Sequence, residues 1–263
     1  MSTYWLADFG NSYLKLGLQR DGVVTLLARI DRRRVDSDPE EAMAGLFDTN
    51  PTVSTIVVST AQLSDRWMVE RFFTFLSPGM SLNYLDSKAP LPFRVQYASG
   101  MPGPDRLANV FALRALAPGK VAIALDFGTV THLTVKDAEG NLGGGAIFPG
   151  IPMMLTSLVE GTAGRLPEVS AEKVGPRANP LECSSTAAIS SGVLYGTVGA
   201  AKELVKQIRR LTGVADAPVF FTGGNAASVR LLLPRDYEER PLLTLEGLGH
   251  FAEWKRSKPL PLP

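Results

Sequence analysis

The chain has 263 residues, 45% of them apolar, and its 27 lysines and arginines nearly balance 26 aspartates and glutamates. This length allows one large domain or two of about 130 residues, and the apolar share is sufficient for a packed core. The near-zero net charge creates no general attraction for nucleic acid or for an anionic membrane, so we expect neither as a partner. A single cysteine, Cys183, excludes an intramolecular disulfide framework. The sequence starts without a basic and apolar leader and has no apolar run near the roughly 20 residues of a membrane span, so we expect a cytoplasmic protein.

The first half of the chain is predicted to open with three strands and to continue with alternating helices and strands. The strands are expected at 5–9, 13–19 and 23–30, with a hairpin turn at Asp21-Gly22. A helix at 39–47, a strand at 54–60, a helix at 65–76, a strand at 82–85, a loop at 86–104 and a helix at 105–117 follow. The basic run at 32–34 stands among acidic residues and is interpreted as a solvated loop.

After Pro118-Gly119-Lys120 the same order begins again. Strands are expected at 121–127, 130–137 and 141–150, helices at 151–160 and 185–212, a strand at 218–224, a helix at 225–233 and a strand-to-helix segment at 241–254. Asp-Phe-Gly ends the first strand of each half, at 8–10 and at 126–128. We therefore predict two duplicated subdomains, residues 1–117 and 118–263, with the two turns in equivalent positions. A coincidental match of three residues is the alternative.

A glycine turn after a strand exposes backbone N–H groups that an anion can approach closely. An aspartate beside it would repel phosphate, and it is better placed to hold a cation or the waters around Mg²⁺. Two such turns facing each other would form a nucleotide cleft. Asp-Phe-Gly also occurs in protein kinases, but here Val121-Ala122-Ile123 is followed by Ala124 and no H-R-D segment exists, so that interpretation fails. The P-loop pattern is not met either.

Six short motifs, in order along nearly the whole chain, resemble those of the type III pantothenate kinases. Residues 8–15 resemble the phosphate hairpin D-x-G-N-[TS]-x-x-K, residues 103–106 the G-x-D-R motif, and residues 126–129 the D-x-G-T motif. Residues 144–150 are similar to G-G-x-I-x-P-G, with Leu166-Pro167 following at the family interval. Segment 185–192 resembles the part of the family that closes over pantothenate, and segment 222–224 resembles the loop near adenine.

The resemblance implies the α/β fold of the acetate and sugar kinase, chaperone and actin superfamily, with two ribonuclease-H-like subdomains around a nucleotide cleft. It also implies a homodimer that transfers the γ-phosphoryl group of ATP to pantothenate, which gives 4'-phosphopantothenate in the first step of coenzyme A biosynthesis. The implied cofactors are Mg²⁺ and a monovalent cation, K⁺ or NH₄⁺. A non-catalytic, nucleotide-binding regulatory homologue of the same family is the alternative, and a different small-molecule kinase on the same fold is a lesser one.

The resemblance also assigns roles to single residues. Asp105 is the general base that accepts the hydroxyl proton of pantothenate, Asp126 is the ligand of the monovalent cation, and Asp8 holds Mg²⁺ through water. The predicted ATP contacts are Asp8, Phe9, Gly10, Asn11, Ser12, Tyr13, Leu14, Lys15 and Thr129. The predicted substrate contacts are Tyr97, Gly103, Pro104, Asp105, Arg106 and Thr186.

Each assignment has a structural alternative. Asp105 could cap the helix that begins there, Thr186 could cap its own helix, and Asp126 could be a turn residue without a ligand. Lys15 could be a solvated lysine, and Tyr97 could simply pack against its neighbours.

The sequence departs from the family pattern after Thr129. Where the family has G-T-A-x-T-x-D, His132 replaces a threonine and Thr134 replaces the last aspartate. The Asn-Pro expected shortly after Tyr97 is also missing. The lost carboxylate could weaken cation binding, and His132 is either a hydrogen-bonded strand histidine or a positive charge that substitutes near the phosphates.

Overall fold

The structure, a computed structural model, describes residues 2–43, 45–46, 53–60, 66–67, 69–70, 73, 79–86, 88–98, 100–175 and 178–258. It contains two five-stranded mixed sheets with helices. The chain divides into two compact units, one made of Met1–Leu116 together with Leu242–Pro263 and the other of Ala117–Pro241. The predicted α/β fold class is confirmed.

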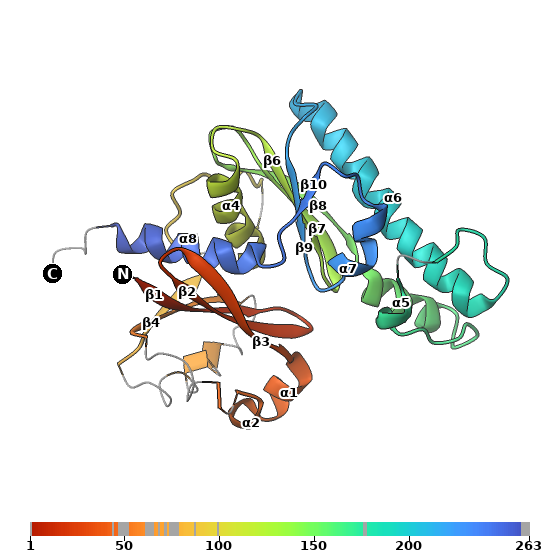
Figure 1. The fold of residues 1–263 in the computed structure, drawn as a ribbon, viewed down its shortest axis with the longest axis horizontal. Coiled ribbons are helices and arrows are strands. Elements are labelled where there is room, and N and C mark those ends of the chain that lie inside the picture. Colours follow the sequence, from red (N-terminus) through yellow and green to blue (C-terminus); the bar gives the residue numbers. More distant parts are fainter. Residues whose placement is uncertain are drawn as a thin grey trace. The chain divides into compact units, whose positions relative to one another are not determined.

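The first unit is built on a sheet with the strand order β3-β2-β1-β4-β5. β1 (Thr3–Phe9), β2 (Tyr13–Arg20) and β3 (Val23–Asp31) form the antiparallel meander that the sequence predicts, and β4 (Thr55–Thr60) and β5 (Ser81–Leu85) continue in parallel with β1 (Figure 1). At the predicted turn, Asp21 and Gly22 have φ angles of 51° and 83°. Both lie in the left-handed region that an Asp-Gly hairpin turn requires.

Alternation along β1 separates the two faces of this sheet. Trp5, Ala7 and Phe9 point into a hydrophobic core that also contains alternate residues of β2. Leu6 and Asp8 point to the opposite face, because successive side chains of a strand alternate. Asp8 therefore lies on the face that the central apolar cluster does not occupy.

Helix α8 (Leu243–Arg256) covers that second face, since a Cβ added to Gly17 would lie 3.1 Å from Leu245. α8 also packs closely on α4 (Pro104–Leu116), where a Cβ added to Gly247 would lie 1.9 Å from the carbonyl oxygen of Ala108. This last helix was expected in the second subdomain, 118–263, but its contacts group it with the first unit. The segment at 241–254, expected to pass from a strand to a helix, contains no strand, and its helix starts at Leu243.

Two short helices, α1 (Arg32–Ser37) and α2 (Pro39–Met43), follow β3. The interpretation of residues 32–34 as a solvated loop is wrong, because α1 starts at Arg32 and this side chain is buried. Asp31 caps the helix by accepting a hydrogen bond from the Arg33 N–H, and Arg32 forms an ion pair with Asp36 one turn later. The helix expected at 65–76 falls largely outside the described residues.

The second unit repeats the arrangement of the first, with the strand order β10-β9-β6-β7-β8. β6 (Ala122–Phe127), β7 (Val130–Lys136) and β8 (Leu142–Pro149) form an antiparallel meander, and β9 (Val219–Thr222) and β10 (Tyr237–Glu239) continue in parallel with β6. β10 was not predicted from the sequence. The two Asp-Phe-Gly segments end the equivalent strands β1 and β6, as predicted.

Helices α5 (Ile151–Gly161) and α6 (Ser185–Thr212) pack on each other in this unit (Figure 1). The cap after the last residue of α6 is Gly213, whose φ of 71° suits a helix C-terminus. The helix expected at 225–233 is divided into α7 (Ala226–Val229) and a 3₁₀ turn at Arg230–Leu232. Another 3₁₀ turn spans Ala171–Lys173. Within the described part of the chain, no helix is long and apolar enough to cross a membrane.

Candidate active site

The first Asp-Phe-Gly turn joins β1 to β2 at the carboxyl end of β1. The Gly10 N–H donates a hydrogen bond of 3.0 Å to the carbonyl oxygen of Tyr13 and closes a turn over residues 10–13. A Cβ added to Gly10 would lie 3.1 Å from that oxygen, so the backbone is tightly folded here. Asn11 at the tip is exposed. Ligands of open α/β sheets bind at the carboxyl ends of parallel strands, which is where this turn lies.

Asp8 and Lys15 lie directly opposite each other on the antiparallel strands β1 and β2. Opposite residues on such strands share a face and have Cβ atoms roughly 4.5–5.5 Å apart. Asp8 is buried and Lys15 is partly buried. The base of the turn therefore combines a carboxylate with an ammonium group on one face of the sheet.

The Gly-Pro-Asp-Arg motif forms the start of α4. Pro104 is the first residue of the helix, where its missing N–H has no intrahelical partner to lose. The Arg106 and Leu107 N–H groups donate to the carbonyl oxygen of Gly103, so Gly103 holds the cap position and Asp105 lies inside the first turn. The Oδ1 atom of Asp105 accepts a hydrogen bond of 2.8 Å from the Arg106 N–H. A Cβ at Gly103 would lie 2.5 Å from the same Oδ1 atom, so the carboxylate folds back over the glycine.

Arg106 is buried, with a relative exposure of 5%. Its Nε and Nη2 atoms have no hydrogen-bond partner among the residues that the structure describes. The guanidinium carbon lies 5.4 Å from the centroid of the Tyr97 ring, so the structure brings two predicted substrate contacts together. Two buried guanidinium nitrogen atoms without acceptors are unfavourable, because each unsatisfied donor retains its desolvation penalty. The planar guanidinium suits a carboxylate or a phosphate as the missing acceptor.

The second Asp-Phe-Gly turn, between β6 and β7, is enclosed by the two other glycine motifs of this unit. The Gly150 N–H donates a hydrogen bond of 3.0 Å to the carbonyl oxygen of Thr129, and a Cβ at Gly150 would lie 2.2 Å from the carbonyl oxygen of Gly128. Gly223, with a φ of 106°, approaches so closely that its Cβ would lie 2.5 Å from the nitrogen of Phe127. Motifs that are far apart in the sequence thus meet at this turn, and both glycines are required by the lack of space.

Asn225 makes a contact to this turn that the sequence analysis missed. Its side-chain Nδ2 donates hydrogen bonds to the carbonyl oxygens of Phe127 and Gly128, at 3.2 and 3.0 Å. Its backbone N–H donates to Phe127 at 2.9 Å. The asparagine directly follows Gly223-Gly224 at the end of a strand, but the two carbonyl oxygens belong to residues 98 and 97 positions earlier, so no local sequence signal marks this contact.

Asp126 lies opposite His132 on β6 and β7, and the His132 Nε2 atom is 3.7 Å from the Asp126 Oδ2 atom. The side chain of His132 is only 9% exposed and that of Asp126 only 13%. A protonated His132 would form an ion pair with Asp126, whereas a neutral one would leave the carboxylate for a cation. Thr134, which replaces the usual carboxylate, is fully buried, and its hydroxyl has no hydrogen-bond partner within the described residues.

Thr186 lies in the first turn of α6, and its side chain is exposed. The cap of this helix is Ser184, whose Oγ atom accepts a hydrogen bond of 3.3 Å from the Ala187 N–H. The capping function that the sequence allowed for Thr186 therefore belongs to Ser184, and Thr186 presents its hydroxyl to solvent.

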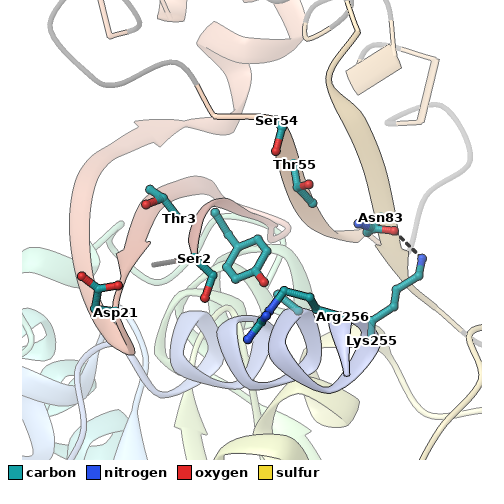
Figure 2. A pocket seen from close by; sticks show the side chains of 10 residues that line it. Ser2, Thr3, Asp21, Ser54, Thr55, Asn83, Lys255 and Arg256 are labelled. Carbon is teal, nitrogen blue, oxygen red and sulfur yellow. Dashed lines mark hydrogen bonds between the residues drawn. The ribbon is translucent and has the colours of Figure 1, made fainter. Parts of the chain in front are cut away.

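A cavity of about 630 Å³ lies at the opposite end of the first sheet, where the parallel strands begin (Figure 2). Its basic side chains already have partners, since Lys255 donates to Asn83 and Arg256 forms an ion pair with Glu253. None of the predicted ATP or substrate contacts lines it; its walls are Ser2, Thr3, Tyr4, Asp21, Ser54, Thr55, Asn83, Ala252, Lys255 and Arg256. This cavity is therefore not the candidate active site.

In the described part of the chain, no three histidine, cysteine or acidic side chains converge as a metal site. The predicted metal ligands, Asp8 and Asp126, belong to the ends of β1 and β6. Mg²⁺ in phosphate-binding sites is commonly held by one or two carboxylates, water and substrate phosphates. Single carboxylates therefore fit a metal that binds together with a nucleotide, and they do not form a preassembled protein cage.

Two sheets of equivalent strand order, each with an aspartate-glycine turn after its first strand, repeat one arrangement in the two units. A Campylobacter jejuni protein assigned to the Baf family of transcriptional activators has a similar fold, with a TM-score of 0.59, 14% identity, and coverage of 97% of this chain and 100% of that one. The MreB 5 protein of Spiroplasma citri bound to AMPPNP gives a TM-score of 0.57 at 9% identity, covering 97% of both chains. At these identities the likeness shows the fold alone.

Sequence comparison defines the family. The family model described as type III pantothenate kinase matches residues 5–207. A type III pantothenate kinase of Methylacidiphilum infernorum is 30% identical over 264 residues, which cover 98% of this chain and 92% of the relative. The chain therefore belongs to the type III pantothenate kinase family.

Proposed function

We propose that this protein transfers the γ-phosphoryl group of ATP to the primary hydroxyl of pantothenate, forming 4'-phosphopantothenate in the first step of coenzyme A biosynthesis. The observation that supports this most strongly is the buried Arg106 next to Tyr97 and Asp105, because two of its nitrogen atoms have no acceptor among the described residues. Pantothenate carries a carboxylate and ATP carries phosphates, so either anion would supply the missing acceptors.

Phosphoryl transfer depends mainly on in-line positioning and on neutralisation of charge. In this proposal Asp105 accepts the proton of the pantothenate hydroxyl as the oxygen attacks. Lys15 and the backbone N–H groups of the turn at 10–13 contact the phosphates, and Thr129 contacts ATP from its own turn. Thr186, exposed in the first turn of α6, donates to pantothenate.

The proposal includes Mg²⁺ held by Asp8 through water, and this ion would neutralise charge on the phosphates of the bound nucleotide. It also includes K⁺ or NH₄⁺ at Asp126. The single buried carboxylate of Asp8 fits Mg²⁺, because the phosphates and water supply the remaining ligands. The carboxylate of Asp126 fits the monovalent cation when His132, 3.7 Å away, is neutral. A protonated His132 would already balance the charge of this carboxylate.

We also propose that the protein is a cytoplasmic homodimer. Ile147 on the edge strand β8 and Met153 on α5 are exposed by 62% and 38%, and both elements belong to the second unit. Apolar side chains on an edge strand are favourable candidates for a contact between copies. Light scattering coupled to size exclusion tests this: the dimer mass is expected, and a monomer mass at micromolar concentration would contradict it.

The catalytic proposal is tested by coupled detection of ADP with and without pantothenate, in Mg²⁺ and K⁺. We expect ADP formation that depends on pantothenate. ADP formation that does not depend on pantothenate would indicate a different small-molecule kinase. Binding of ATP without turnover at millimolar concentrations would indicate a regulatory homologue, and either result would overturn the proposal.

A further inference from the structure

The two Asp-Phe-Gly turns share a feature that the motifs do not contain. In each turn, the carbonyl oxygen of the glycine accepts a hydrogen bond from a side chain outside the turn. The donor to Gly128 is Nδ2 of Asn225, at 3.0 Å, and the donor to Gly10 is Nη1 of Arg32, at 3.4 Å. Asn225 follows β9, whereas Arg32 follows β3, so different elements supply the same contact to equivalent turns.

These contacts fix the direction of the N–H groups that follow. A trans peptide unit is planar, so its carbonyl oxygen and the N–H of the next residue point in opposite directions and rotate together. A donor on the Gly128 carbonyl therefore sets the direction of the Thr129 N–H. Because Asn225 also donates to the Phe127 carbonyl, it sets the Gly128 N–H as well, and two consecutive peptide planes are held.

The environment of Arg32 is consistent with the same function. Its side chain is 10% exposed, its Nε atom donates to Asp36 at 2.7 Å, and its guanidinium carbon lies 5.8 Å from the centroid of the Phe9 ring. Its backbone N–H donates to the carbonyl oxygen of Ser12 at 2.8 Å. Arg32 therefore contacts two carbonyl oxygens of the turn at 10–13, those of Gly10 and Ser12, and sets the direction of the Asn11 N–H.

We propose that Asn225 and Arg32 are positioning residues for nucleotide binding: they orient the backbone N–H groups of the two turns toward the phosphates without contacting the substrate themselves. This inference rests on the proposed function, because it takes the phosphates of ATP as the ligand of both turns. Glycine rotates more readily than other residues, and a glycine turn that binds an anion benefits from a fixed orientation before the ligand arrives.

The first test compares Asn225→Ala with Asn141→Ala. Asn141 is a matched control, because it is also partly buried in the second unit and its Nδ2 donates to Asp137 in another turn of the same sheet, the one between β7 and β8. We expect Asn225→Ala to raise KM and Kd for Mg-ATP by roughly tenfold, with kcat changed by less than about threefold. Asn141→Ala is expected to leave these constants unchanged.

Hydrogen–deuterium exchange in the ligand-free protein provides a readout that does not depend on activity. Peptides covering 126–130 are expected to exchange faster in Asn225→Ala than in the native protein, and their exchange rate is expected to stay unchanged in Asn141→Ala. If the alanine variant does not fold, Asn225→Asp, which keeps the shape and removes the amide donor, gives the same comparison. In the first unit, exchange and the Kd for Mg-ATP are compared between Arg32→Met and Arg33→Met. Arg33 is the control, because its side chain is 92% exposed.

The proposal is overturned if Asn225→Ala alters neither exchange nor the Kd for Mg-ATP, or if Asn141→Ala has the same effect on both. Faster exchange with an unchanged Kd would also overturn it, because the turn would then not orient a ligand. If the wild-type protein binds Mg-ATP but does not phosphorylate pantothenate, the proposed function fails while exchange and nucleotide affinity still decide this inference.

Discussion

Replacement of Arg106 by methionine is expected to stabilise the ligand-free protein and to weaken substrate binding. Methionine has a similar length and fills the same space, but it has no charge and no donors. In the native protein Arg106 is 5% exposed, and two of its guanidinium nitrogen atoms have no acceptor among the described residues. The two effects have opposite signs because the arginine is satisfied only when an anion is bound.

The size of both effects follows from the two guanidinium nitrogen atoms that have no partner within the described residues. A buried donor without a partner costs about 1–3 kcal/mol, so their removal is expected to raise the free energy of unfolding by about 2 kcal/mol or more. For a chain of this size that corresponds to a rise in Tm of at least about 4 °C. Two hydrogen bonds to a charged ligand contribute about 3–6 kcal/mol, so the KM for the anion they bind is expected to rise by roughly 10²–10⁴.

The assay combines thermal unfolding without ligand with steady-state kinetics at varied pantothenate and varied ATP, and the substrate whose KM rises identifies the anion. Arg114→Met is the matched control, because Arg114 belongs to the same helix and its guanidinium carbon lies 5.6 Å from the centroid of the Phe93 ring. That variant is expected to leave both KM values unchanged. A lower Tm together with unchanged KM values in Arg106→Met would refute the reasoning and would make Arg106 a structural residue.

Three further predictions concern the general base, the cation and acid stability. Asp105→Asn is expected to lower kcat by about 10²–10⁴ while ATP binding is retained, and near wild-type turnover would assign Asp105 a structural role in its helix. Activity is expected to rise with K⁺ relative to a bulky cation at equal ionic strength, and Asp126→Asn is expected to abolish that rise. Equal rates of the native protein in both salts would favour a protonated His132 as the positive charge next to Asp126. At 3.7 Å from the Asp126 Oδ2 atom, the protonated ring would attract the carboxylate by about 4 kcal/mol at an effective dielectric of about 20. Burial alone would raise the pKa of Glu253, but hydrogen bonds from Ser2 and Arg256 lower this pKa below its ordinary value of 4.5. The ionised Glu253 therefore contributes to stability above pH 4.5, and this contribution is lost as the pH falls through the lowered pKa. Denaturant titrations between pH 3 and pH 6, roughly the range of carboxyl titration, are expected to show a weaker pH dependence in Glu253→Gln, and identical curves would contradict this.

The sequence was sufficient for the two meanders and their turns because these depend on local signals. Alternation in 13–19 and the Asp21-Gly22 pair predict β2 and its turn, and the structure has both. The strand β10 was missed because Tyr237–Glu239 is only three residues long and is polar, and its pairing with β9 comes from a segment distant in the sequence. No local period marks such a strand.

Arg32 and Asn225 show the same limit at the candidate site. A basic run among acidic residues is typical of a solvated segment, and only the fold brings the Arg32 side chain to the Gly10 carbonyl. Asn225 follows two glycines and was predicted to open a helix, but its side chain reaches back across the sheet to a turn about a hundred residues earlier. The motif residues could be identified from the sequence, whereas the side chains that hold the motif backbone depend on tertiary contacts.

The most direct test of the proposed activity is the detection of 4'-phosphopantothenate by mass spectrometry after incubation of the purified protein with pantothenate, Mg-ATP and K⁺. The Asp105→Asn variant is the matched control, because it preserves the shape of the site and removes the proposed proton acceptor. Time-dependent formation of the phosphorylated product by the native protein, with product greatly reduced in the variant, is the predicted result. No product above a no-enzyme control at millimolar ATP would contradict the account.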